Sequence, residues 1–113
     1  MGWIKACMVE DVKLAEAYKI ETEPPISVFN ADGQFFAIDD TCTHGLSSLS
    51  EGYVEDCQVE CAWHYARFDL RTGCALSLPA TAGLQTYPVR VDGDAIYVDI
   101  PDSILAASSL GAG

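Results

Sequence analysis

Positive charge is scarce in this sequence. Of its 113 residues only six are Lys or Arg, against 17 Asp or Glu, so the formal net charge is -11. A surface this negative repels nucleic-acid phosphates and anionic lipid headgroups, so neither is an expected partner. Basic protein surfaces are the partners that this charge favours.

Long apolar runs are missing as well. No stretch approaches the roughly 20 apolar residues that a membrane-spanning helix needs. The first residues, Met1–Ala6, lack the charged start and apolar run of a secretory signal peptide. We therefore expect no membrane association and a location in the cytoplasm. The length of 113 residues predicts a single domain, and we expect it to be monomeric.

The periodicity of a helix is not sustained anywhere, and only residues 10–17 are expected to hold a helical turn. Short apolar runs between turn residues instead predict an all-β sandwich or barrel. In the last predicted hairpin Pro88 has to lie at an edge or a strand start, because it has no N–H to donate. The apolar side of that hairpin is expected to hold Val89, Val91, Ile96, Val98 and Ile100. The predicted strands are residues 4–8, 17–21, 26–30, 34–38, 58–61, 66–70, 87–91 and 95–100.

Residues 41–83 depart from this pattern because loops dominate them. We predict that they form a small inserted subdomain within the single domain 1–113. The tail, residues 101–113, is rich in Ala, Ser and Gly and is expected to be flexible.

Histidine is nearly absent, and the number of cysteines is odd. Any imidazole chemistry has to use His44 and His64, the two histidines of the chain. Five cysteines without a secretory leader argue against a disulfide-stapled scaffold. Cys7, Cys57 and Cys74 are expected to be small packing residues or free thiols.

The remaining two cysteines and both histidines form one pattern. Cys42-Thr43-His44 is followed, after sixteen residues, by Cys61-Ala62-Trp63-His64. Two thiolates and two imidazoles can bind a single tetrahedral Zn²⁺. They can equally bind a two-iron cluster, with both cysteines on one iron and both histidines on the other. Zinc sites more often pair cysteine with cysteine, so one cysteine and one histidine in each loop favour the cluster.

The segments Cys42–Gly45 and Cys61–Gly73 resemble the Rieske-type [2Fe-2S] ferredoxins of bacterial aromatic-ring-hydroxylating dioxygenase systems, and the resemblance covers nearly the whole chain. It implies the Rieske β-sandwich fold and one [2Fe-2S] cluster bound by Cys42, His44, Cys61 and His64. It also implies that a set of neighbouring residues surrounds the cluster: Gly45, Leu46, Trp63, Tyr65, Ala66 and Pro79. Tyr65 departs from the family pattern, which more often has Gly there.

The resemblance implies a one-electron carrier rather than an enzyme. Its partners would be an NAD(P)H-dependent flavoprotein ferredoxin reductase and a terminal Rieske non-haem iron dioxygenase. The chain is not expected to be the oxygenase itself, because a mononuclear iron site needs two further histidines. Its small size also leaves no room for a catalytic domain.

A low reduction potential is expected because this sequence differs from the respiratory Rieske proteins at four positions. Those proteins carry a disulfide at the positions of Ser47 and Trp63, and Ser and Tyr hydroxyls at those of Ala66 and Phe68. Since none of these side chains can replace the missing groups, the potential is expected near the low end of the Rieske range, about -150 mV.

Other interpretations stay open. The chain could be a Rieske-like small subunit of another reductase complex, or a structural Cys2His2 zinc module. The acidic residues Glu51, Glu55, Asp56 and Glu60 are expected to form a solvated face, with partner docking as the alternative.

Overall fold

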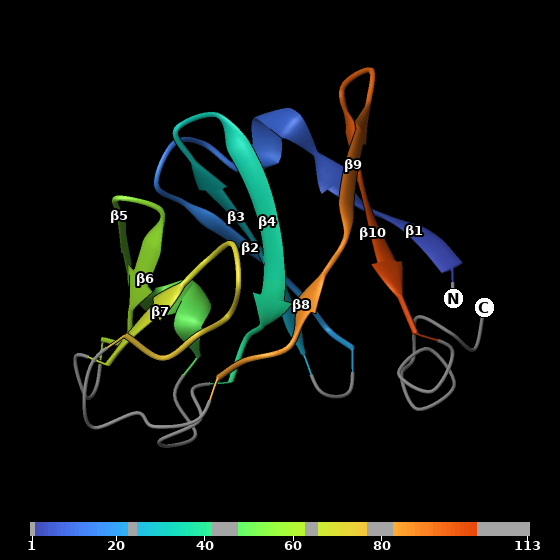
Figure 1. The fold of residues 1–113 in the computed structure, drawn as a ribbon. Helices are drawn as coiled ribbons and strands as arrows, with labels where there is room; N and C mark the ends of the chain where they lie inside the picture. Colours follow the sequence, from blue (N-terminus) through green and yellow to red (C-terminus); the bar gives the residue numbers. More distant parts are fainter. Residues whose placement is uncertain (1, 23–24, 42–47, 63–65, 77–82, 102–113) are drawn as a thin grey trace.

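The computed structural model describes residues 2–22, 25–41, 48–62, 66–76 and 83–101. Within these ranges the chain forms ten strands and two short 3-10 helices, arranged as three antiparallel sheets (Figure 1). In chain order the elements are β1 (Gly2–Met8), η1 (Val9–Asp11), β2 (Ala17–Ile20), β3 (Ile26–Ala31), β4 (Gln34–Asp39), η2 (Leu49–Glu51), β5 (Tyr53–Glu55), β6 (Gln58–Glu60), β7 (Arg67–Asp69), β8 (Thr86–Tyr87), β9 (Val89–Asp92) and β10 (Ala95–Ile100). The all-β prediction is confirmed.

The three sheets lie side by side, with the sheet β2-β3-β4-β8 in the middle (Figure 1). The sheet β1-β10-β9 joins the first and last strands, and the sheet β5-β6-β7 forms on the other side. No helix in the described part of the chain is long and apolar enough to cross a membrane.

Strand β3 is the centre of the packing because both of its faces are covered. Ile26 and Val28 face one hydrophobic cluster, which also holds residues of β10. Phe29 and Ala31 point the other way, into a cluster that holds residues of β6 and β7. Successive residues of a strand point to opposite faces, so a strand buried on both sides has to be apolar almost throughout.

Pro88 divides the predicted strand 87–91 into two. Tyr87 ends β8, which pairs with β4, whereas Val89 begins β9, which pairs with β10. Both β8 and β9 are edge strands. Pro88 therefore lies between two sheet edges, as expected for a residue that has no N–H to donate. Val91 lies on the predicted apolar side, opposite Ile96, but it is not buried. Its side chain is 46% exposed because it lies on the edge strand, whereas its partner Ile96 on the central strand is fully buried.

Two local features differ from the sequence prediction. The helical turn expected within residues 10–17 is the shorter η1 at Val9–Asp11. Strand β5 was not predicted, since its turn to β6 uses Asp56 and Cys57 with φ angles of 53° and 59°. Asn-Gly or Asp-Gly normally signals such a left-handed pair, and cysteine does not. Of the predicted flexible tail, residues 102–113 lie outside the described residues.

Gly73 lies at a close approach between two backbone segments. Its carbonyl accepts a hydrogen bond from the N–H of Leu84 at 2.7 Å, and its own N–H donates to the carbonyl of Asp69 at 2.7 Å. Its φ is +78°, and a Cβ atom there would lie 2.1 Å from the carbonyl oxygen of Leu84. Only glycine satisfies both conditions without strain.

Gly73→Ala is therefore expected to lower the free energy of unfolding by about 3 kcal/mol, from left-handed backbone strain plus steric overlap. Gly33→Ala is the matched control, since Gly33 has a φ of +85° but no atom within 4 Å of the position that a Cβ would take. The control should lose only the strain, about 1 kcal/mol. Urea denaturation of the variants measures both values, and equal losses would show that the close approach is not tight.

Candidate metal centre

Of the four predicted cluster ligands, Cys61 lies in the part of the chain that the structure describes. Cys42, His44 and His64 lie outside the described residues. So do most of the predicted surrounding residues, namely Gly45, Leu46, Trp63, Tyr65 and Pro79, and Ala66 is the exception. The described residues instead show how the ends of the segments 42–47, 63–65 and 77–82 are held.

The first segment leaves the end of β4 and returns at η2. Thr41 and Ser48 form an antiparallel bridge across it. Directly outside this bridge, the N–H of Leu49 donates to the carbonyl of Asp40 at 2.6 Å. The two ends of the segment carrying Cys42 and His44 are thus joined by backbone contacts.

The second segment connects β6 and β7. Glu60 pairs with Arg67 in the β6–β7 hairpin, and the N–H of Cys61 donates to the carbonyl of Ala66 at 2.7 Å. Cys61 and Ala66 are both fully buried. Because this bond extends the ladder by one step, Cys61 is held at the end of the paired part of the hairpin.

The third segment is held by β7 at one end and β4 at the other. The N–H of Leu76 donates to the carbonyl of Arg67 at 2.7 Å. After the segment, Asp39 accepts hydrogen bonds from the N–H of Gln85 at 3.3 Å and from the hydroxyl of Tyr87 at 2.6 Å. Burial, together with the hydrogen bond to Asp39, raises the pKa of Tyr87, so this hydroxyl stays protonated and remains a donor.

All three segments end at one hydrophobic cluster. Leu49 follows the first segment, Cys61 and Ala66 flank the second, and Leu84 follows the third, and all four belong to the cluster centred on Phe29 and Phe68. The fit to an iron–sulfur cluster can be tested on this arrangement. Cys61 is a buried thiol, and the flanks of the segments that carry one more cysteine and two histidines lie in the same cluster, which fits the donor set of a mixed Cys2His2 cluster.

Two side chains on the returning side of the β6–β7 hairpin cannot donate a hydrogen bond. Ala66 lies opposite Cys61 and Phe68 lies opposite Val59, and both side chains are fully buried. Sequence reasoning singled out these two positions, but it missed Asp39 and Asp40. No sequence signal marks those aspartates, because their partners are distant in the chain.

The other cysteines behave as expected. Cys7 and Cys57 are buried thiols, and Cys74 is an exposed one. Burial, with a smaller contribution from Asp11, raises the pKa of Cys7 to about 11. Burial also raises the pKa of Cys57, against the opposing effect of the Arg71 charge. Both thiols are therefore protonated at neutral pH.

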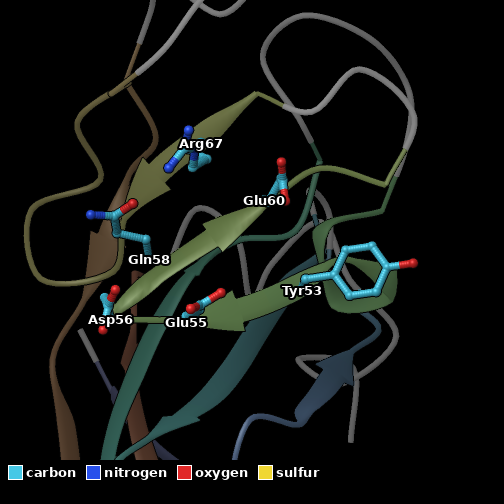
Figure 2. Close-up of a pocket in the computed structure, with 6 residues that line it drawn as sticks. All are labelled: Tyr53, Glu55, Asp56, Gln58, Glu60 and Arg67. Carbon is cyan, nitrogen blue, oxygen red and sulfur yellow. The ribbon is translucent and has the colours of Figure 1, made fainter.

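Three of the four predicted acidic residues, Glu55, Asp56 and Glu60, lie on the outer side of the sheet β5-β6-β7 (Figure 2), whereas Glu51 is exposed at the end of η2. Tyr53, Glu60 and Arg67 form one row across the three strands, because they are register partners. Glu55 and Asp56 lie at the other end of the same face and are exposed. Glu60, on this face, directly precedes Cys61, and the exposed Glu55 and Asp56 open the face to solvent.

Residues 2–88 match the sequence pattern of the Rieske [2Fe-2S] domain. The chain belongs to the Rieske family. It is 53% identical over 104 residues to the 3-phenylpropionate/cinnamic acid dioxygenase ferredoxin subunit of Escherichia coli (strain K12), and the match covers 91% of this chain and 98% of that protein.

Two solved structures also resemble this Rieske protein. The Sphingomonas yanoikuyae B1 ferredoxin is 34% identical with a TM-score of 0.83, over 88% of this chain and 100% of that one. A chain from the complex of reduced oxygenase and oxidized ferredoxin in carbazole 1,9a-dioxygenase is 34% identical with a TM-score of 0.81, over 85% and 100%. The predicted Rieske fold and [2Fe-2S] cofactor are confirmed by the family match and these likenesses.

Maleimide treatment of the native Rieske protein is expected to modify Cys74 before Cys7 or Cys57. Cys74 is exposed, whereas burial and raised pKa values suppress the reactive thiolate of the other two. Peptide mass spectrometry after timed quenching measures the order. Cys74→Ser should remove the fast reaction, and fast labelling of Cys7 in the folded protein would contradict its burial.

Proposed function

We propose that this Rieske ferredoxin is the one-electron carrier of an aromatic-ring dioxygenase system. It takes electrons from an NAD(P)H-dependent flavoprotein ferredoxin reductase and delivers them to a terminal Rieske non-haem iron oxygenase. The observation that carries the proposal is the 53% identity to a dioxygenase ferredoxin subunit over nearly the full length of both chains. Like that relative, it is an electron-transfer component and not itself an enzyme.

In this proposal Cys42 and Cys61 bind one iron, and His44 and His64 bind the other. When bound, the cluster accepts and releases one electron at a time. Two thiolates and two neutral imidazoles leave the oxidised cluster uncharged, which makes reduction easier than with four thiolates. Residues 41–83 are the proposed cluster-binding part of the single domain.

The residues packed around Cys61 make the surroundings of the proposed cluster apolar. The apolar cluster that includes Leu49 and Leu84 keeps water from the buried thiolate. The side chains of Ala66 and Phe68 donate no hydrogen bonds, so they do nothing to stabilise added negative charge. This supports a low-potential carrier, suited to electrons that come from NAD(P)H.

Surface charge is the proposed basis of partner recognition. A net charge of -11 attracts the carrier to basic surfaces on the reductase and the oxygenase. We infer that the carrier works as a monomer, because transient binding to two partners in turn requires a free docking surface. We also infer that it works in the cytoplasm.

The alternatives differ in metal content and in partners. A structural zinc module would be colourless and hold one zinc, which the Rieske match does not favour. A small subunit of another reductase complex would purify together with a large catalytic subunit.

The experiment that tests the function starts from the purified protein. It should hold two irons and two sulfides, show an EPR signal only after reduction, and carry electrons from a flavoprotein reductase to an aromatic-ring dioxygenase. His64→Cys provides a matched variant, since a third thiolate should lower the potential by adding negative charge. Zinc in place of iron, or no electron transfer by the iron-loaded protein, would contradict the proposal.

The same samples give the reduction potential by redox titration. We expect it near the low end of the Rieske range, about -150 mV, because Ala66 and Phe68 offer no donors to the sulfurs. A potential well above zero would show that other groups stabilise the reduced state.

Electron transfer from the reductase is expected to slow as salt increases. Between about 10 mM and 1 M salt the Debye length falls from about 30 Å to about 3 Å, which screens the attraction of opposite charges. Stopped-flow reduction measures the rate. Glu55→Gln, on the acidic face, can be compared with Asp94→Asn in the β9–β10 turn, and a rate independent of salt would exclude electrostatic steering.

A further inference from the structure

We infer that Asp40 is a positioning residue, whose buried carboxylate joins both ends of the segment carrying Cys42 and His44 and anchors them to the central sheet. This inference rests on the proposed function, because it takes these two residues as ligands. It assigns a role to a side chain that binds no metal itself.

The carboxylate of Asp40 receives hydrogen bonds from both sides of the segment. Its own position is just before the segment, directly after β4. Beyond the segment, the hydroxyl of Ser48 donates to its Oδ2, and the N–H of Ser50 donates to its Oδ1 at 2.9 Å. One side chain therefore spans the gap that the Thr41–Ser48 bridge closes on the backbone.

The same carboxylate is fixed to the central sheet. The hydroxyl of Ser27, on β3, donates to Oδ1 at 2.5 Å. The ammonium of Lys19, on β2, lies 3.8 Å from Oδ2. The backbone N–H of Asp40 donates to the carbonyl of Pro25 at 2.9 Å. The ends of the segment are thus held against β2 and β3 as well as against each other.

Burial makes this arrangement more than a surface network. Asp40 is 1% exposed, and a buried carboxylate is costly unless its oxygens are hydrogen-bonded and its charge is paired. Both oxygens are satisfied, by three donors and a cation. Each of the two side-chain oxygens accepts at least one hydrogen bond, which lets one side chain bind donors from β3 and from η2 at once.

Replacing a residue that serves only folding stability should lower the melting temperature and leave the EPR g-values and the reduction potential unchanged, unlike replacing a positioning residue. Asn30 is the matched comparison, since it too is buried and hydrogen-bonded. Its amide donates to the carbonyl of Val12 at 2.8 Å and accepts from the N–H of Gly33 at 3.0 Å. It lies at the β3–β4 turn, at the opposite end of β4 from Asp40 (Figure 1).

The test compares the iron-loaded wild type with Asp40→Ala, Ser48→Ala and Asn30→Ala. The readouts are the EPR g-values of the reduced protein, its reduction potential, the rate of iron release to a chelator, and the melting temperature. Ser48→Ala removes one donor to Asp40 and leaves the net charge unchanged. A change in g-values there reports altered ligand geometry rather than lost charge.

We expect Asp40→Ala and Ser48→Ala to shift the g-values and the potential. Iron release from Asp40→Ala should be about tenfold faster or more, by analogy with the loss of metal affinity when a group that orients a ligand is removed. Asn30→Ala should lower the melting temperature and leave the g-values and the potential at wild-type values.

Wild-type g-values and potential in Ser48→Ala would overturn the inference, even if Asp40→Ala fails to fold. Equal shifts in Asn30→Ala would overturn it too, since they would reflect general loss of stability. If the wild type itself shows no EPR signal of a mixed-ligand cluster, the proposed ligand set fails, and this inference fails with it.

Discussion

The packing of the sheet β5-β6-β7 against the central sheet is the contact on which the candidate centre depends. Val59 and Phe68 on one side meet Phe29 and Ile38 on the other, all fully buried. Residues that flank the segments 42–47, 63–65 and 77–82 lie in this same cluster. Without it the β6–β7 hairpin would be a short ribbon with little stability of its own. Cys61 would then have no fixed relation to the segment that follows β4.

Two adjacent aspartates at the end of β4 face different segments. Asp39 holds the chain that leads into β8, through Gln85 and Tyr87. Asp40 holds the segment before η2, through Ser48 and Ser50. Neighbouring residues of an extended chain point in opposite directions, so one strand end can fix two segments at once. The end of β4 therefore organises two of the three segments, and the β6–β7 hairpin supplies the third.

The sequence predicted the parts of this fold that depend on local pattern. The strand around Val28 follows from a short apolar run and the strand around Ile96 from apolar alternation, and the family follows from the resemblance of the segments that hold Cys42, His44, Cys61 and His64. Strand β5 did not follow, because a turn through Asp56 and Cys57 lacks the usual residues. The roles of Asp39 and Asp40 did not follow either. Ser27 is thirteen residues from Asp40 and Tyr87 is 48 from Asp39, so only the folded chain brings these groups together.

Interior and surface meet different requirements of a carrier. Around Cys61 the described chain is apolar and closely packed, so few dipoles there have to reorient when one electron is gained or lost. The buried carboxylate of Asp40 is held by donors on both oxygens, so it too is fixed in place. Exposed negative charge lies outside, on residues such as Glu55 and Asp56, where water solvates it and partners can sense it. A carrier packed this way is expected to change its charge with little rearrangement around Cys61.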